Sequence, residues 1–336
     1  QLDFLVGRGV PAARLDSSLS RDEVLAGYDD LYAGRLKLLY VSPERLNNER
    51  FLRSLERRTI SLLAVDEAHC ISEWGHNFRL DYLKIAQLAR QLRVQRVLAL
   101  TATATPQVAG DITRGFAIDP GDVVHTGFYR RNLKLYATPC ETNRRDALLV
   151  QRFRERPPGP AIVYVTLQRT AERVADLLSN SGLDARPYHA GMESGEREAI
   201  QDDFMASDRI VVVATIAFGM GIDKADIRYV YHYNLPKSLE SYSQEIGRAG
   251  RDGRESICEL LASADDVVVL ENFSYGDTPT AGAVASLTAD VLDRGDPFDV
   301  SVFTLSSEHD VRPLVVRTLL TYLELDGIIR STGPFY

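Results

Sequence analysis

Short apolar runs rich in β-branched residues alternate along this chain with stretches of helical period. The runs lie at residues 37–41, 60–65, 97–100, 161–165, 210–214 and 229–233. Between them, residues 81–92 and 169–181 carry apolar side chains at helical spacing. Continuous apolar runs of this length are typical of strands covered on both faces, so they predict the buried strands of a parallel sheet. The alternation of strand and helix predicts an α/β fold.

Chain-breaking residues divide this pattern into parts. The sequence Arg-Glu-Arg-Pro-Pro-Gly-Pro at residues 154–160 stands just before a new strand, so we place a second α/β unit there, after a connector within residues 128–141. Past about residue 265, Pro and Gly near residues 279 and 295 indicate a different module. The expected parts have these bounds: 1–134, 135–265 and 266–336.

The last part has a helical pattern from Glu308 to Gly327, followed by the strand-like residues 328–330 and a turn. A helix that leads into a hairpin predicts a winged-helix-like module, which we expect to be incomplete at Tyr336. The chain starts at Gln1 with neither an initiator Met nor a signal pattern, so we expect the first part to be incomplete at its N-terminus.

Composition narrows the class of protein. No run of eighteen apolar residues occurs, so we expect no membrane span and no membrane partner. Cys70, Cys140 and Cys258 are widely separated and form no Cys-x-x-Cys pair, which argues against a disulfide framework or a cysteine zinc site. We therefore expect a reducing, cytoplasmic setting, associated with the nucleoid if the source is prokaryotic.

The net charge of −8 hides an asymmetry. Residues 255–336 hold fourteen acidic residues and four arginines, whereas residues 1–254 hold 33 acidic and 35 basic residues. Nucleic-acid binding needs a local basic footprint, which a near-neutral body can still present. The total charge therefore does not exclude a nucleic-acid partner, and the acidic end of the chain is expected to pack on the core or to meet a protein.

Two carboxylates, Asp66 and Glu67, follow the apolar run that ends at Val65. Ligands of open α/β sheets bind at the carboxyl ends of strands. Phosphoryl transfer uses such a pair, one carboxylate for Mg²⁺ and one to orient the attacking water. A solvated loop after a strand is the alternative, and for a bare Asp-Glu pair it is the better interpretation.

Two further segments carry polar groups suited to this chemistry. The run from Thr101 to Thr105 follows another strand, although ordinary helix capping before Pro106 explains its hydroxyls equally well. Among the glycines of residues 244–253, Arg248 and Arg251 lie three apart, a spacing that lets two guanidinium groups converge on phosphate. A solvated basic loop is the alternative there.

Taken in order, five segments resemble the helicase motifs of RecQ-family DNA helicases within helicase superfamily two. The resemblance covers roughly residues 1–264 and implies two RecA-like lobes. Residues 74–82 are the part that resembles RecQ enzymes more than general RNA helicases. The five segments are 66–70, 72–82, 101–105, 217–224 and 244–253.

The resemblance implies a role for each matching residue of the nucleotide site. Asp66 would bind the Mg²⁺ of MgATP through water, and Glu67 would position or deprotonate the hydrolytic water. His69 would link this site to the second lobe through Gln244. Arg248 and Arg251 would contact the γ-phosphate region of the nucleotide. Asp223 would lie near the ribose.

Residues 72–82 look like the family's aromatic-rich loop, which couples DNA binding to hydrolysis. Aromatic faces and arginine grip single strands without reading sequence, although core aromatics are the alternative. The expected DNA contacts in this loop are Trp74, His76, Phe78 and Arg79. Weaker candidates at or shortly after strand ends are Ser42, Arg45, Thr101, Thr103, Thr166, His189 and Thr215.

Three departures from the family pattern limit the resemblance. None of the five lysines follows a glycine, so the phosphate-binding Gly-Lys-Ser/Thr loop is absent from these residues, which we interpret as truncation. The four-cysteine zinc module is also absent, and no zinc is predicted. In the aromatic-rich loop, Glu73, Asn77 and Leu80 stand where the family more often has Gln, Asp and Pro.

The sequence therefore predicts an ATP-dependent DNA helicase of RecQ type, which uses ATP and Mg²⁺ and moves 3′ to 5′ on single-stranded DNA. Its partners would be single-stranded and duplex-junction DNA, in recombination or repair. Without the phosphate loop, these 336 residues alone are expected to be inactive. The alternatives are a superfamily-two RNA helicase and a catalytically dead nucleic-acid-binding or scaffold module.

Overall fold

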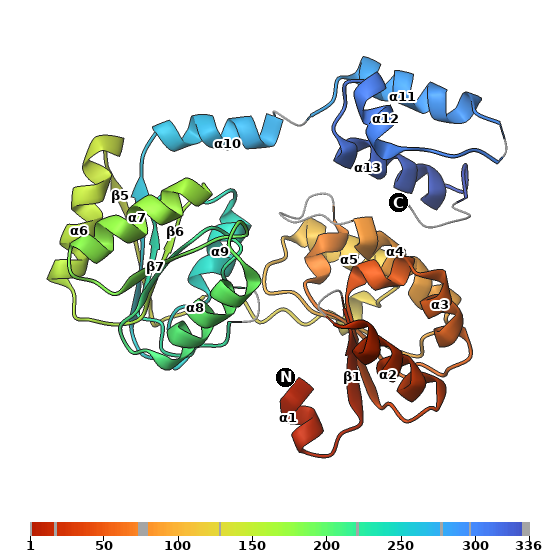
Figure 1. Cartoon of the computed structure of the whole chain (residues 1–336), viewed down its shortest axis with the longest axis horizontal. Helices are drawn as coiled ribbons and strands as arrows, with labels where there is room; N and C mark the ends of the chain where they lie inside the picture. Colours follow the sequence, from red (N-terminus) through yellow and green to blue (C-terminus); the bar gives the residue numbers. More distant parts are fainter. Residues whose placement is uncertain are drawn as a thin grey trace. The chain divides into compact units, whose positions relative to one another are not determined.

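The computed structural model describes the chain apart from residues 1, 17–18, 73–79, 128, 220–221, 276–277, 296 and 331–336. It divides into two compact units (Figure 1). Unit 1 comprises residues 1–125 and 279–336, and unit 2 comprises residues 126–278. The three-part division expected from the sequence stays a prediction.

Unit 2 is built on a six-stranded sheet in which every neighbouring pair is parallel. In its centre, Val163 pairs with Val213 on one side and with Tyr231 on the other. In spatial order the strands are β5 (Leu133–Pro139), β10 (Ser256–Ala262), β9 (Tyr229–His232), β6 (Ala161–Tyr164), β8 (Val211–Ala214) and β7 (Ala185–Tyr188).

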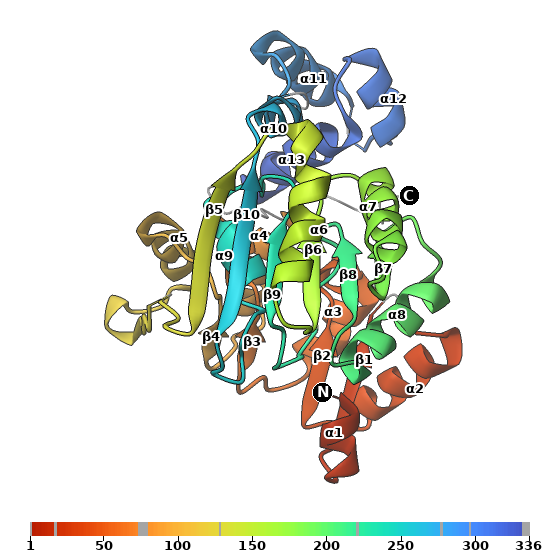
Figure 2. The ribbon, with the colours of Figure 1, turned by 90° about the vertical axis from the view of Figure 1, so that its left-hand side faces the viewer.

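Helices cover both faces of this sheet (Figure 2). On one face, α6 (Arg145–Glu155) and α7 (Gln168–Asn180) pack on alternate strand residues such as Val163. On the other face, α8 (Ser194–Ala206) and α9 (Leu239–Ile246) pack on the residues between them, such as Ile162. Strands buried on both faces favour apolar side chains at every position, which is why the runs at β6 and β8 are uninterrupted and the run at β9 is broken only by His232. The predicted α/β fold with a parallel sheet is confirmed.

Unit 1 has two separate pairs of parallel strands. They are β1 (Ala12–Leu15) with β2 (Leu38–Val41), and β3 (Leu63–Val65) with β4 (Val97–Ala99). In the first segment of this unit, residues 1–125, the helices are α1 (Leu2–Gly7), α2 (Arg21–Tyr32), α3 (Glu49–Glu56), α4 (Leu80–Gln91) and α5 (Pro106–Phe116). Short 3₁₀ helices are η1 (Pro43–Asn47), η2 (Ala68–Ile71) and η3 (Pro120–Asp122) here, and η4 (Thr142–Arg144) in unit 2.

The strands of unit 1 are less buried than their sequence predicts. Leu38, Leu62 and Leu98 are 37%, 54% and 45% exposed. Their neighbours Leu63, Val65 and Val97 belong to a core that packs on α4 and α5. Within the described residues, helices therefore cover one face of β3 and β4, and the expectation of strands buried on both faces is wrong for this unit.

The end of the chain is helical. After α10 (Asp265–Tyr275), the helices α11 (Ala281–Asp293), α12 (Val302–Glu308) and α13 (Pro313–Leu325) share a core around Leu287, Leu305 and Leu320. The predicted helix is present as α13, but the strand expected at residues 328–330 is not formed. The amides of Ile328 and Ile329 instead donate to the carbonyl of Leu323 (2.9 and 3.2 Å), which closes the end of α13 as a turn. Among the described residues, none of the helices has the length and apolar character needed to cross a membrane.

Candidate functional site

The two predicted carboxylates lie directly after β3, in the turn between that strand and η2. Glu67 has a left-handed backbone (φ 50°, ψ 40°), which is uncommon for a residue other than glycine. Its amide donates a hydrogen bond to Asp66 Oδ1 (2.9 Å). A short acidic side chain that accepts from the backbone stabilises such a turn. The two carboxylates are thus positioned by their own backbone at the carboxyl end of the strand.

His69 connects this turn to the end of the neighbouring strand. Its ring is 1% exposed, and Nδ1 lies 3.0 Å from Thr101 Oγ1 and 3.3 Å from Glu67 Oε2. The Thr101 hydroxyl donates in turn to the Thr103 carbonyl (3.2 Å). Strands β3 and β4 are adjacent and parallel. The turn after β3 and the residues after β4, which the sequence linked only through the family resemblance, therefore lie in contact. Thr103 itself is buried, and its Oγ1 has no hydrogen-bond partner within the described part of the chain.

The carboxylate pair fits a magnesium ion in its donor chemistry. Asp66 is exposed, and the Glu67 side chain is 38% exposed, so both can be reached from solvent. Carboxylate oxygens are the ligands that Mg²⁺ prefers, often with water between metal and protein. Asp66 would hold the ion, and the ion would supply charge neutralisation for phosphate oxygens.

The predicted arginines lie in an irregular segment after α9, residues 247–254, which we call the arginine loop. The Arg248 guanidinium donates to the carbonyl of Gly219. Arg251 Nη1 lies 2.8 Å from Asp223 Oδ1, with 38% and 87% of the two side chains exposed. Both arginines therefore contact residues 217–224, the segment that the resemblance identifies as the preceding motif.

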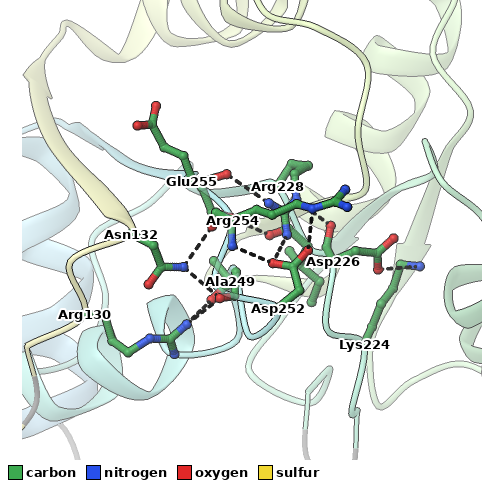
Figure 3. Close-up of polar contacts among 12 residues, drawn as sticks. Arg130, Asn132, Lys224, Asp226, Arg228, Ala249, Asp252, Arg254 and Glu255 are labelled. Carbon is green, nitrogen blue, oxygen red and sulfur yellow. Dashed lines mark hydrogen bonds and ion pairs between the residues drawn. The ribbon is translucent and has the colours of Figure 1, made fainter.

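Contacts from α9 and from the turn before β9 support the arginine loop. Gln244 lies on α9, and its neighbour Glu245 forms a buried pair with His232 (2.7 Å). Arg228 donates to Asp252 Oδ1 (2.7 Å), and this hydrogen bond holds the pKa of the Asp252 carboxyl below its usual range (Figure 3). The turn before β9 thus holds the arginine loop at Asp252, and the buried His232–Glu245 pair fixes α9, after which the loop starts.

The weaker candidates of unit 2 come together at one edge of its sheet. Thr166, Thr215 and His189 follow β6, β8 and β7, which are neighbours in the strand order. The Thr166 amide donates to Asn234 Oδ1 (3.2 Å), and His189 Nε2 lies 3.2 Å from Glu172 Oε1. A shallow pocket opens beside this edge, lined by residues that include Tyr164, Thr166, His232, Asn234, Lys237 and Glu245.

The other candidates lie in or near unit 1's short elements. Ser42 precedes η1, and its carbonyl accepts from the Arg45 amide (3.0 Å). The Arg45 Nε atom is buried with no hydrogen-bond partner among the described residues. The four expected DNA contacts of the aromatic-rich loop lie outside the described residues: Trp74, His76, Phe78 and Arg79.

Sequence reasoning missed three residues that hold these segments in place. Asn234 binds the backbone of Thr166, and Arg130 and Asn132 bind carbonyls of the arginine loop. Polar residues directly before β5 and after β9 are the only signal that points to them. That signal is weak, since surface loops carry such residues without any role.

Two family models match the chain. The model described as DEAD/DEAH box helicase matches residues 8–112. The model described as helicase conserved C-terminal domain matches residues 144–253. The first match includes the carboxylate pair and all four weaker candidates of unit 1, and the second includes nearly all of the arginine loop.

Curated relatives extend these matches. The ATP-dependent DNA helicase RecQ of Bacillus subtilis is 42% identical over 270 residues, which cover 80% of this chain and 45% of that protein. The ATP-dependent DNA helicase Q-like 5 of Arabidopsis thaliana is 36% identical over 326 residues, which cover 94% of this chain and 36% of that protein. The chain thus spans less than half of the length of either relative.

Solved structures agree on the fold. Mycobacterium smegmatis helicase Lhr bound to ssDNA and AMP-PNP matches with a TM-score of 0.58 and 20% identity, over 86% of this chain and 41% of that one. Saccharomyces cerevisiae Dbp5 bound to RNA and ADP BeF3 matches with a TM-score of 0.58 and 16% identity, over 80% of this chain and 69% of that one. At such identity, the likeness shows the RecA-like helicase fold and leaves the choice of nucleic acid open.

Proposed function

Because this chain belongs to the RecQ family of superfamily-two helicases, we propose that the protein containing it is an ATP-dependent DNA helicase. The observation that carries the proposal is the 42% identity to a RecQ helicase over 80% of the chain. The positions of Asp66, Glu67 and Thr101 at adjacent strand ends agree with it, because ligands of parallel sheets bind at that edge.

In the proposed reaction, Glu67 orients or deprotonates the water that attacks the γ-phosphate. Asp66 would hold Mg²⁺, which would neutralise charge on the phosphate oxygens. Arg248 and Arg251 stabilise the charge that develops on the γ-phosphate, and Asp223 contacts the ribose. Arg251 must leave Asp223 to do so. That exposed ion pair is worth only about 0–1 kcal/mol, so a phosphate competes with it easily.

His69 is proposed to report the state of the carboxylate site to the DNA-binding segments. Within unit 1 it bridges Glu67 and Thr101, so a shift of either residue reaches the other. Its link to Gln244 stays part of the proposal. The nucleic-acid contacts of Trp74, His76, Phe78 and Arg79, and of the strand-end residues, have the same status.

We further propose 3′ to 5′ movement on single-stranded DNA, action on duplex junctions in recombination or repair, and a cytoplasmic setting, nucleoid-associated in a prokaryote. The direct test uses the intact protein, with ATP turnover measured with single-stranded DNA and with RNA of matching sequence. Stimulation by DNA at least about tenfold above that by RNA is expected. Equal or greater stimulation by RNA would support an RNA helicase, and no turnover with either would support a catalytically dead module.

The acidic helical end of the chain, residues 266–336, is proposed to pack on the core or to contact a protein. Within unit 1, Lys84 of α4 forms an ion pair with Glu324 of α13 (3.0 Å), which supports packing on the core. Deletion of residues 297–336 should leave affinity for duplex DNA within about twofold of the intact protein, since few cations are lost. A larger loss of affinity in a fluorescence-anisotropy titration would contradict this role.

A further inference from the structure

We propose that Arg130 and Asn132, in the segment just before β5, are positioning residues for the arginine loop. This inference rests on the proposed function, because it assigns them to the orientation of Arg251. The two residues are separated from the loop by more than a hundred positions in sequence. In space, their side chains converge on the backbone around Ala249 and Gly250 (Figure 3).

Four hydrogen bonds carry the inference. Asn132 Nδ2 donates to the carbonyls of Gly250 (2.7 Å) and Arg254 (2.8 Å). Arg130 Nη2 donates to the carbonyls of Gly250 (2.6 Å) and Ala249 (3.1 Å). The bound carbonyls lie on both sides of Arg251 in sequence. The position of its main chain is therefore set from two ends by the same short segment.

The loop depends on these donors because its backbone is neither helix nor strand. Gly250 and Gly253 have φ of 56° and 81°, and within the loop the Gly250 carbonyl accepts one backbone hydrogen bond, from the Gly253 amide (3.0 Å). Its other donors are the side chains of Arg130 and Asn132. Loss of a donor to a buried carbonyl is destabilising, so the loop retains the conformation that keeps these hydrogen bonds. Gly250 is buried, so its carbonyl has little access to water as a substitute donor.

Packing makes the fit between Asn132 and the loop close. A side-chain carbon built on Gly250 would lie 2.5 Å from Asn132 Nδ2 and 2.7 Å from Ser256 Oγ. The Ser256 amide also donates to the Asn132 carbonyl (3.0 Å), so Asn132 is bound at both its main chain and its side chain. A movement of residue 132 therefore cannot occur without moving the loop.

The segment with Arg130 and Asn132 lies where the chain enters unit 2. Unit 2 begins at Thr126, so Arg130 and Asn132 lie in the first residues that the chain contributes to that unit. The loop is also held by the turn before β9, through the Gly250 amide on the Ile227 carbonyl (3.0 Å) and through Arg228 on Asp252. The loop is thus fixed between that turn and the entering segment, and a shift of the entering segment displaces Arg251.

The test compares Asn132→Asp with Arg131→Ala in the intact protein. Aspartate has the shape of asparagine but no N–H donor, and it directs carboxylate oxygens at the two carbonyls. Arg131 is exposed, and no contact of its side chain is recorded among the described residues, so its variant is the matched control. With saturating single-stranded DNA, Asn132→Asp should lower kcat about tenfold and change KM for ATP by less than about twofold, because misplacement of a transition-state group affects kcat. Arg131→Ala should match the wild type.

A double variant, Asn132→Asp with Arg251→Ala, distinguishes positioning of Arg251 from a merely structural role of Asn132. If Asn132 acts through Arg251, adding Asn132→Asp to Arg251→Ala should lower kcat no further, whereas independent effects multiply. A multiplied loss, or a rise in KM that tracks a lowered thermal midpoint, would overturn the inference. If Asn132→Asp fails to fold, Arg130→Met is judged by the same criteria, with a loss of kcat of about threefold expected because both hydrogen bonds from Arg130 Nη2 are removed.

The outcomes also separate this inference from the proposed function. Loss of turnover in Arg251→Ala with wild-type turnover in Asn132→Asp would overturn the inference and leave the function standing. Wild-type turnover in Arg251→Ala, or no DNA-stimulated hydrolysis by the wild type, would overturn both.

Discussion

The carboxylate pair and the arginine loop are held by different kinds of contact. Glu67 is positioned by its own left-handed backbone, by the Asp66 carboxylate and by His69, which all lie within three residues of it. The arginine loop is positioned by Arg130, Asn132 and Arg228, which lie on other segments of unit 2. The first arrangement is local in sequence, and the second is not.

This difference teaches where each region is vulnerable. A strained residue such as Glu67 keeps its conformation only because its immediate surroundings determine it, so changes outside the Glu67–His69–Thr101 contacts should affect it little. The arginine loop has glycine freedom of its own and takes its shape from partners far away in sequence. Substitutions of those partners should therefore act on the loop as strongly as substitutions inside it.

The largest effect is expected at the carboxylate pair. Glu67→Gln keeps the size of the side chain but removes the carboxylate charge, which orients the attacking water or accepts its proton. The kcat for ATP hydrolysis should therefore fall about 1000-fold. Nucleotide affinity should change less than about threefold. Steady-state turnover and fluorescent-nucleotide titration measure the two quantities. Glu56→Gln, at an exposed position at the end of α3, is the control and should behave as wild type.

A similar but smaller effect is expected in the arginine loop. Arg251→Ala should lower kcat at least about 100-fold, because arginines at the γ-phosphate contribute that much or more in related reactions. Arg254→Ala removes a guanidinium from the same loop. The Arg254 side chain is 84% exposed, and its ion pair with Asp252 is loose, with Nε 3.9 Å from Oδ2. Turnover of Arg254→Ala within about twofold of wild type would show that hydrolysis depends on the position of the Arg251 guanidinium and not on the total positive charge of the loop. Equal losses in both variants would contradict the assignment.

Two glycines of the loop sharpen the comparison through stability. Gly250→Ala should lower the free energy of unfolding by about 2–4 kcal/mol, since it adds backbone strain and a clash with Asn132 and Ser256. Gly253→Ala adds strain alone, because nothing lies within 4 Å of its side-chain position, and should cost about 1 kcal/mol. Urea unfolding measures both. Equal costs would mean that contacts of Gly250 do not shape the loop.

The smallest effect is expected for the contact between Arg251 and Asp223. Loss of this exposed ion pair in Asp223→Asn should change kcat by less than about threefold. If Asp223 also contacts the ribose, KM for ATP should rise, and 2′-deoxy-ATP should be affected less by the substitution than ATP. A large fall in kcat without any change in KM would contradict the ribose assignment.

Much of the fold follows from the sequence where a strand is buried on both faces. The runs at β6 and β8 are uninterrupted for that reason, the run at β9 is broken only by His232, and all three were predicted. Strands β1, β5, β7 and β10 were not, since they carry charged residues, proline or a polar alternation, as in Ala-Arg-Pro-Tyr of β7. Loops share such patterns, so sequence alone cannot separate these strands from loops.

The site divides in the same way. Asp66, Glu67, Arg248 and Arg251 were predicted because short motifs carry them. Arg130, Asn132 and Asn234 were missed because they act through carbonyls and amides of residues far along the chain, and backbone groups leave no mark on the sequence. The strand predicted at residues 328–330 failed because the turn that ends α13 uses those amides.

The central claim is that Glu67 and Arg251 serve one DNA-stimulated hydrolysis of ATP. The most direct measurement is single-turnover ATP hydrolysis by the intact wild type, Glu67→Gln and Arg251→Ala, each with saturating single-stranded DNA and nucleotide. The account predicts DNA-stimulated hydrolysis by the wild type and a loss of at least about 100-fold in both variants, with nucleotide still bound. Hydrolysis near the wild-type rate in either variant would contradict it.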